Sequence, residues 1–250
     1  MPSVNELQGK TVVITGGARR LGRAIALAMA RAGAQVAFTY LNSADAANET
    51  LRQIIDAGAK AYGIKCDVRS EKMVARAVSS ILEHFGRIDV LVNNAGFFET
   101  AAFEQITTEQ WDNMFATNVR GPFLFSRYAA PALRKSKGRI IHMGSLGGEK
   151  PWATHAHYCA SKAALHMLTG VMAKALAPDI TVNCVAPGMI DSGGKKTDDD
   201  ALLFERLAER APMRKNGTPA DVVDAVMYIA TCSRFITGQI LTVDGGLGLV

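Results

Sequence analysis

The sequence contains few cysteines, and their spacing suggests no pairing. Only four cysteines occur in 250 residues, and none of them belongs to a CxxC motif. Such spacing provides neither a disulfide framework nor a set of metal ligands. We therefore expect no metal site and buried, reduced thiols at Cys66, Cys159, Cys184 and Cys232. Reduced thiols fit a cytoplasmic protein.

Long apolar runs and targeting segments are also absent. Residues 1–10 are polar and lack the apolar centre of a signal peptide. No apolar run reaches the length of a membrane span. Only 8 prolines are present and no segment has low complexity, so we expect disorder only in short loops. These absences predict a cytoplasmic protein without a membrane partner.

The charge balance does not favour nucleic acid as a partner. The net charge is +5, and lysine and arginine are scattered along the chain. A nucleic-acid-binding protein concentrates such charge on one face or in a tail. Two of the short basic clusters, Lys195–Lys196 and Arg214–Lys215, are interpreted as solvated surface. The third, Arg19–Arg20, can serve an anionic cofactor.

Strand and helix patterns alternate along the whole chain. Such alternation is typical of right-handed crossovers and of a parallel sheet covered on both faces. No linker or repeat divides the chain, so we expect one doubly wound α/β domain over residues 1–250, with about seven strands. The strands are expected at 10–15, 35–40, 61–65, 88–92, 139–143, 180–186 and 239–243. The helices are expected at 20–32, 45–57, 71–85, 108–134 with an interruption at Gly121–Pro122, 158–176, 199–210 and 220–230.

A glycine-rich turn joins the first expected strand to the first expected helix. Residues 15–22 read TGGARRLG. Glycines in such a turn let the backbone approach a pyrophosphate, which then lies on the amides of the helix N-terminus. The alternative is a tight turn that only needs positive φ. The position between a strand and a helix favours a dinucleotide site.

The end of the second expected strand has no acidic residue. Residues 38–43 read FTYLNS, and the first acid is Asp45. An NAD-preferring fold of this type usually has Asp or Glu here to bind the ribose 2′-hydroxyl, and a carboxylate would repel a 2′-phosphate. Arg19 can supply positive charge, and Thr39, Asn42 and Ser43 can donate hydrogen bonds. We therefore predict that NADP(H) is preferred over NAD(H).

Motifs along essentially the whole chain resemble, in order, those of the short-chain dehydrogenase/reductase family. The glycine turn matches TGxxxGxG except that Arg20 replaces the middle glycine, which resembles the TGxxxRxG motif of the pteridine reductase branch. Residues 93–96 read NNAG, residues 158–162 read YCASK and residues 243–246 read VDGG. The resemblance implies a single-domain Rossmann-type fold and a nicotinamide cofactor.

The resemblance also implies which residues contact the dinucleotide. Asp67 and Val68 match the pair that contacts adenine, and Pro187–Gly188 matches the loop beside the nicotinamide. The guanidinium of Arg20 either points away from the pyrophosphate or binds it through its planar fork. Cofactor contacts are expected at Gly16, Arg19, Arg20, Leu21, Gly22, Tyr40, Asn42, Ser43, Asp67, Val68, Asn94, Ala95, Gly96, Tyr158, Lys162, Pro187, Gly188 and Ile190.

A catalytic tetrad is expected at Asn118, Ser145, Tyr158 and Lys162. Tyr158 and Lys162 are four residues apart at the start of a helical run and so share a helix face. The resemblance implies that Tyr158 gives a proton to the alkoxide left by hydride transfer, and that Lys162 lowers the pKa of that phenol and holds the nicotinamide ribose. It further implies that Ser145 binds the carbonyl oxygen and that Asn118 supports a water linking Lys162 to solvent.

Two other patterns near the tetrad are interpreted without catalytic roles. His155 and His157 do not share a helix face and have no carboxylate beside them, so we expect substrate-loop or surface residues rather than metal ligands. The motif GxSxG is absent around Ser145, which argues against a serine hydrolase. Residues 191–200, DSGGKKTDDD, are expected to form a mobile lid over the site.

Three functions remain open. The leading one is NADP(H)-dependent transfer of hydride between the nicotinamide and a carbonyl or alcohol, of the 3-oxoacyl thioester or general ketone type, and Ser145 supports it. Pterin reduction is suggested by Arg20 and residues 39–43, but the pteridine reductases typically carry Asp at the position of Ser145. A non-catalytic NADP-binding sensor would not need to keep Tyr158 and Lys162 together.

Assembly into a homo-oligomer, a tetramer or a dimer, is expected from the same resemblance. The helices at 108–134 and 158–176 resemble those that build the dimer and tetramer interfaces of the family. The apolar C-terminal residues 245–250 are expected to be covered rather than exposed, because exposed apolar surface favours association.

Overall fold

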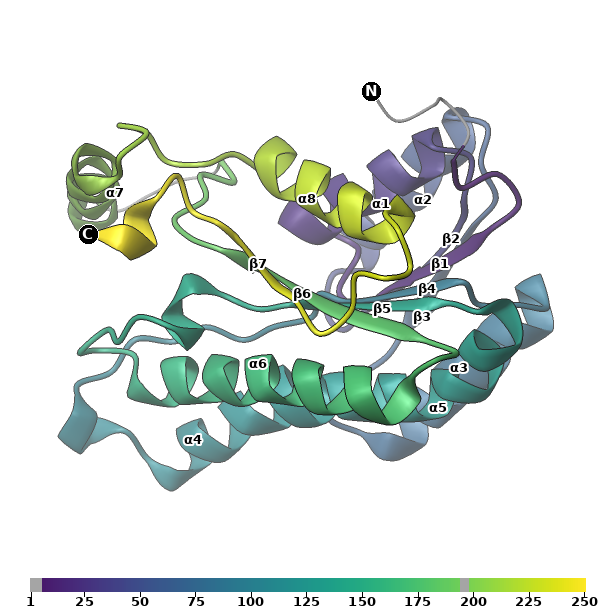
Figure 1. Ribbon diagram of the computed structural model, residues 1–250, viewed down its shortest axis with the longest axis horizontal. Coiled ribbons are helices and arrows are strands. Elements are labelled where there is room, and N and C mark those ends of the chain that lie inside the picture. The colour runs from purple at the N-terminus through teal and green to yellow at the C-terminus, as the bar shows by residue number, and fades with distance from the viewer. Residues whose placement is uncertain (1–5, 194–197) are drawn as a thin grey trace.

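Seven parallel strands form one sheet at the centre of the molecule (Figure 1). The computed structural model describes residues 6–193 and 198–250. The strands lie in the order β3-β2-β1-β4-β5-β6-β7, and every neighbouring pair is parallel. Their bounds are β1 Thr11–Ile14, β2 Gln35–Tyr40, β3 Ala61–Lys65, β4 Val90–Asn93, β5 Arg139–Met143, β6 Thr181–Pro187 and β7 Ile240–Val243. The predicted doubly wound, single-domain fold is confirmed.

Helices cover both faces of this sheet. Helices α1, α2 and α8 lie on one face, and α3, α4, α5 and α6 lie on the other (Figure 1). The helices are α1 Arg20–Arg31, α2 Ala44–Asp56, α3 Glu71–Phe85, α4 Thr108–Phe115, α5 Gly121–Ser136, α6 Ala156–Leu176, α7 Asp198–Arg210 and α8 Pro219–Thr231. Shorter turns are η1 Phe103–Gln105, η2 Ala116–Arg120, η3 Leu146–Gly148 and η4 Leu247–Leu249. No helix in the described ranges is long and apolar enough to cross a bilayer.

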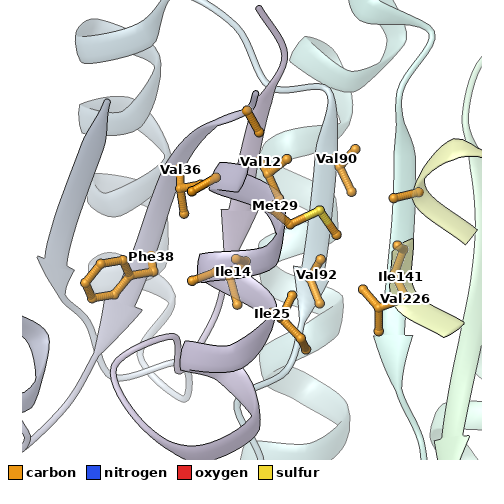
Figure 2. Packing of buried hydrophobic residues seen from close by; sticks show 14 of the residues in the cluster. Val12, Ile14, Ile25, Met29, Val36, Phe38, Val90, Val92, Ile141 and Val226 are labelled. Atoms are coloured by element: carbon orange, nitrogen blue, oxygen red, sulfur yellow. The ribbon is translucent and has the colours of Figure 1, made fainter. Parts of the chain in front are cut away.

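The central strands are apolar on both faces, as a doubly covered parallel sheet requires. Successive side chains of β1 point to opposite sides, so Val12 and Ile14 belong to one core cluster and Val13 to the other. Figure 2 shows the first cluster, in which Ile25 and Met29 of α1 pack on β1 and its neighbours. All five side chains are at most 1% exposed, so this packing fixes the register between sheet and helices.

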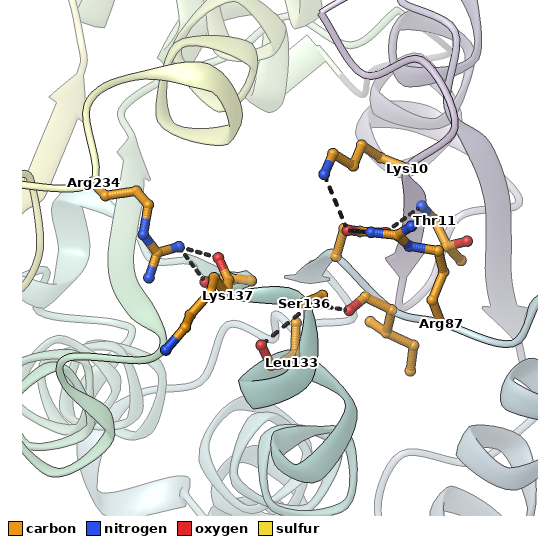
Figure 3. Close-up of polar contacts among 10 residues, drawn as sticks. Lys10, Thr11, Arg87, Leu133, Ser136, Lys137 and Arg234 are labelled. Atoms are coloured by element: carbon orange, nitrogen blue, oxygen red, sulfur yellow. Dashed lines mark hydrogen bonds and ion pairs between the residues drawn. The ribbon is translucent and has the colours of Figure 1, made fainter.

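The amino ends of the strands are joined through a buried carboxylate. Asp89, just before β4, is 4% exposed and accepts hydrogen bonds from the backbone N–H of Thr11 at 2.9 Å and from the guanidinium of Arg87 at 2.6 and 2.8 Å. Lys10 lies 3.5 Å from the same carboxylate (Figure 3). These contacts hold β1 beside β4 and leave the carboxyl ends of the strands for the site.

The expected long helix at 108–134 is interrupted, but the predicted place of the interruption is wrong. Residues Ala116–Arg120 form a single π-helical turn between α4 and α5, before Gly121–Pro122. Pro122 lies in the first turn of α5, where its missing N–H costs no intrahelical hydrogen bond. The glycine and proline therefore lie at the start of α5, directly after the π turn.

Candidate active site

A cavity of about 690 Å³ opens at the carboxyl ends of the central strands. It lies next to β1, where the strand order reverses: β2 and β3 lie on one side of β1, and β4 to β7 lie on the other. Ligands bind at this place in doubly wound sheets. The predicted cofactor residues that line it are Gly16, Arg19, Arg20, Leu21, Gly22, Tyr40, Asn42, Ser43, Asp67, Val68, Asn94, Ala95 and Gly96. Residues not named in the prediction also line it, among them Ala18, Leu41, Cys66, Arg69, Phe97, Asn113 and Thr117.

The glycine turn leaves no room for side chains on its inner side. A Cβ on Gly22 would lie 2.2 Å from the carbonyl oxygen of Gly16 and 2.6 Å from Nδ2 of Asn94. Gly16 itself has φ of +66°, in the left-handed region. Asn94 holds the turn by donating to the carbonyl oxygens of Thr15 at 2.9 Å and Gly16 at 3.1 Å. The backbone amides at the start of α1 are thus open to a ligand from the cavity.

Arg20 keeps the backbone conformation of the glycine that it replaces. Its φ is +48°, a left-handed conformation that costs a residue with a side chain roughly 1–2 kcal/mol. Arg19 and Arg20 are both exposed, and neither makes an ion pair within the described part of the chain. Two unpaired cations at the N-terminus of a helix make that end of the cavity favourable for an anion.

The opposite end of the cavity contains a carboxylate that is already paired. Both oxygens of Asp67 accept hydrogen bonds from the guanidinium of Arg69, at 2.8 to 3.1 Å. Arg69 also donates to Asn113 at 3.1 Å. The hydrogen bonds from Arg69 lower the pKa of Asp67, so the carboxylate stays ionised. Among the residues that the structure describes, no other acidic residue lines the cavity, so this lining has an excess of positive charge.

The structure brings the four predicted catalytic residues together beside this cavity. Tyr158 and Lys162 lie in the first turns of α6, and Nζ of Lys162 is 5.7 Å from the centre of the tyrosine ring. Ser145 lies between β5 and η3 as the N-cap residue of η3, and a hydrogen bond with Tyr158 lowers the pKa of the phenol. A Cβ on Gly96 would lie 3.6 Å from Oδ1 of Asn118 and 3.8 Å from Nζ of Lys162, so Gly96 lies next to both side chains.

The acid–base properties of Tyr158 differ from the expectation. Burial raises the pKa of the phenol, and the hydrogen bond with Ser145 opposes that rise. Lys162 does not lower it in this structure, because its ammonium donates to the carbonyl oxygen of Met143 at 2.8 Å and burial lowers its own pKa to about 8. At neutral pH the phenol is therefore protonated, which is the form that can donate a proton.

Asn118 owes its position to the π turn. Its amide donates to the carbonyl oxygen of Phe97 at 2.9 Å and to the hydroxyl of Ser161 at 3.0 Å, and its Oδ1 accepts from the N–H of Phe97 at 2.7 Å. Single π turns inside α-helices occur frequently at functional sites. Asn118 thus fixes the backbone next to Gly96, and the water proposed to link it with Lys162 stays a prediction.

His166 is a site residue that the sequence reasoning missed. Its Nε2 accepts a long hydrogen bond, 3.5 Å, from the N–H of Ser145. Its ring fills the space over Gly144 and Gly148, where an added Cβ would lie 2.4 Å and 2.6 Å from ring atoms. Burial lowers the pKa of His166 to about 4, so the ring is neutral. Its spacing of four residues from Lys162 on the same helix was the signal that could have identified it.

The interpretation of the two histidines before Tyr158 is wrong for His157. Helix α6 begins at Ala156, two residues earlier than expected, so His157 lies in its first turn and is fully buried. His155 lies just before the helix and contacts the hydroxyls of Thr100 and Thr154, each at 3.0 Å.

The remaining predicted residues lie at the carboxyl end of β6. A Cβ on Gly188 would lie 2.6 Å from Cβ of Asp244, so Pro187–Gly188 packs against the VDGG segment. Ile190 forms a parallel bridge with Gly217.

The central part of the predicted lid, residues 194–197, lies outside the described residues. Within the single chain Leu249 is 86% exposed, so the expected cover of the C-terminal residues does not come from the chain itself.

Comparisons with known proteins agree on one family. A family model described as enoyl-(acyl carrier protein) reductase matches residues 16–248. The chain is 35% identical to an uncharacterized oxidoreductase of Methylorubrum extorquens, over 98% of this chain and 100% of that protein. It is 34% identical to a 3-oxoacyl-[acyl-carrier-protein] reductase of Staphylococcus epidermidis, over 95% and 98% of the two chains.

Solved structures give the same result. A short-chain dehydrogenase/reductase from Serratia marcescens has 37% sequence identity and a TM-score of 0.91, and the match covers 98% of this chain and 100% of that one. A putative short-chain alcohol dehydrogenase from Sinorhizobium meliloti has 30% identity and a TM-score of 0.92, with 98% of both chains covered. The chain therefore belongs to the short-chain dehydrogenase/reductase family, whose members are oxidoreductases that use a nicotinamide cofactor.

Proposed function

We propose that this protein reduces a ketone or 3-oxoacyl carbonyl to an alcohol with NADPH. The observation that carries the proposal is the grouping of Ser145, a protonated Tyr158 and Lys162 beside the cavity, where Ser145 acts on the pKa of the phenol. Two adjacent hydroxyls can both donate to one carbonyl oxygen. Lys162, 6% exposed, adds a positive charge beside them.

The residues of the cavity fit a dinucleotide. The glycine turn allows a pyrophosphate to approach the start of α1, and a Cβ on Gly22 would disrupt this turn by colliding with the carbonyl oxygen of Gly16. Arg19 and Arg20 provide the opposite charge. When bound, the nicotinamide supplies the hydride for the carbonyl carbon. The roles of the chain itself are to bind the cofactor, to orient the carbonyl and to deliver the proton.

The proton reaches the substrate through Tyr158. Ser145 donates a hydrogen bond to the carbonyl oxygen and fixes its position. As negative charge develops on that oxygen, the phenol of Tyr158 transfers its proton to it, forming the O–H bond of the alcohol. Once the phenolate has formed, the nearby ammonium of Lys162 is proposed to stabilise it, because an opposite charge nearby favours the charged form. In this structure Lys162 does not yet have this role, since its ammonium donates to Met143.

A substrate screen tests the proposed function. NADPH oxidation is followed with 3-oxoacyl thioesters, other ketones, quinones, keto sugars and dihydropterins. We expect turnover with at least one ketone or 3-oxoacyl thioester. Turnover with dihydropterins alone would favour the pterin reductase alternative. Tight NADPH binding without turnover of any compound would favour the sensor alternative.

Cofactor preference is predicted to depend on Arg19. Wild-type protein should bind NADPH more tightly than NADH, and Arg19→Ala should weaken NADPH binding by about tenfold or more, the value of a charge-assisted hydrogen bond. NADH binding should change much less, because NADH lacks the 2′-phosphate. Fluorescence titration of both cofactors measures this. Arg31→Ala, an exposed arginine at the other end of α1, is the control. Equal or tighter binding of NADH by the wild type would contradict the assignment.

Assembly into a dimer or tetramer is predicted from the outer faces of α5 and α6. Phe123 on α5 and Met167 and Val171 on α6 are 43%, 71% and 56% exposed in the single chain. Such a group of apolar side chains favours association. Light scattering at micromolar concentration should give a mass above that of one chain, and Met167→Glu should lower it. A monomeric wild type would show this proposal to be wrong.

A further inference from the structure

Two aromatic rings contact the ring of Tyr158, and a third ring packs against both of them. Phe98 meets it edge-on, with 4.9 Å between ring centres and an angle of 85°. Trp152 lies nearly parallel to it, at 6.2 Å and 15°. His155 stacks on Phe98 at 4.8 Å and meets Trp152 edge-on at 5.6 Å. We call Phe98, Trp152 and His155 the aromatic wall. Its members come from the segment after β4, the segment after η3 and the residue before α6.

Part of the ring surface of the aromatic wall is uncharged and lies outside the hydrophobic core. Phe98 is 56% exposed although it touches the half-buried site residue Tyr158. The two ring nitrogens of His155 are satisfied by Thr100 and Thr154. Burial lowers the pKa of His155, and neighbouring His157 lowers it further, so the ring is neutral at neutral pH. The wall is therefore an apolar, π-rich surface beside the proton donor.

We propose that the aromatic wall binds the aryl group of an aromatic ketone, which defines the substrate class of this enzyme. The proposal rests on the proposed function. A carbonyl oxygen that receives the proton of Tyr158 lies within hydrogen-bond distance of it, so a substituent on the carbonyl carbon lies beside the rings around Tyr158. Aromatic pairs prefer edge-on and offset-stacked contacts with centres 4.5–7 Å apart. Exposed Phe98 and half-buried Trp152 offer a substrate ring both kinds of contact.

A saturated substituent would gain less from the same wall. It would bury apolar area, but it has no π-system to match the quadrupoles of the rings. Each aromatic pair contributes a factor of about two to twelve beyond area burial. A linear acyl chain has the same disadvantage as a saturated ring. The wall therefore distinguishes aryl ketones from aliphatic ones.

The test compares acetophenone with cyclohexyl methyl ketone, which has a saturated ring of similar size. For each enzyme the ratio of the two kcat/KM values is measured with NADPH. Phe98→Leu should lower the aryl-to-saturated ratio by about three- to tenfold, because leucine keeps the apolar character and removes the π face. Trp152→Leu should lower it as well. The different intrinsic reactivities of the two ketones cancel when a variant is compared with the wild type.

Phe235→Leu is the matched control. Phe235 is 99% exposed and precedes β7, at the amino end of the sheet and away from the site, so its replacement should leave the ratio unchanged. A ratio that stays within twofold of wild type in both Phe98→Leu and Trp152→Leu would overturn the proposal. Turnover of 3-oxoacyl thioesters or keto sugars without turnover of acetophenone would overturn the aryl preference and leave the proposed function intact. Absence of any carbonyl reduction by NADPH-bound enzyme would overturn both.

Discussion

Replacing Tyr158 with phenylalanine should lower kcat by about 10²–10⁴-fold while NADPH affinity stays nearly intact. Phenylalanine keeps the ring that Phe98 and Trp152 contact, but it has no proton to donate. The alkoxide formed by hydride transfer would have to take its proton from water. The loss therefore falls on the transition state and not on the binding of the cofactor.

The measurement needs a ketone that the wild-type enzyme reduces. kcat is determined on that ketone, and NADPH affinity is determined by fluorescence titration of the same preparation. Tyr62→Phe is the control, because Tyr62 lies on β3 and its hydroxyl is hydrogen-bonded to Ser80 at 2.8 Å. A Tyr158→Phe enzyme with near wild-type kcat would mean that another group donates the proton.

Lys162→Met should lower turnover strongly and weaken NADPH binding, yet make the cofactor-free protein more stable at neutral pH. Burial lowers the pKa of Lys162 from 10.5 to about 8. Below pH 8 the folded chain therefore contains an ammonium that its surroundings disfavour, at a cost on the order of 1–3 kcal/mol. Methionine fills similar space without charge. The loss of the hydrogen bond to Met143 offsets part of the gain.

The pH dependence of this stability difference has a defined sign. Between about pH 8 and 10.5 the folded chain has released the Lys162 proton and the unfolded chain still holds it, so wild-type stability rises with pH in this window. The advantage of Lys162→Met should thus be largest below pH 8 and shrink toward pH 10.5. Urea unfolding of both proteins at pH 7 and pH 10 measures it. Exposed Lys174→Met should show no such change. An advantage that grows with pH would refute this account.

Much of the fold could be predicted because local patterns were consistent with one architecture. The strands were predicted within about two residues of their observed ends, since buried parallel strands are short apolar runs between glycines and helical segments. The i, i+4 spacing of Tyr158 and Lys162 correctly placed both on one face of α6. The position of the glycine turn correctly indicated the cavity.

The features that were missed depend on contacts between distant segments. The burial of His157 follows from the packing of the start of α6, and the N-cap residue of this helix is His155, which makes no capping hydrogen bond and does not mark the start in the sequence. The place of His166 depends on Gly144 and Gly148, which lie in a different segment. The pKa of Tyr158 is set mainly by burial, which the tetrad motif does not reveal.

The π turn at Ala116–Arg120 makes the site sensitive to the helical phase of the chain, and not only to residue type. In a regular α-helix each residue advances the direction of its side chain by about 100°. A π turn inserts one residue, so the helix before it and the helix after it are out of phase by that angle. Removing one residue between α4 and α5 would restore a regular helix. Either Asn118 would then turn away from Phe97, or it would lose its present orientation relative to the face that α5 packs on the sheet. The number of residues between Phe115 and Gly121 is therefore itself a structural requirement of the site.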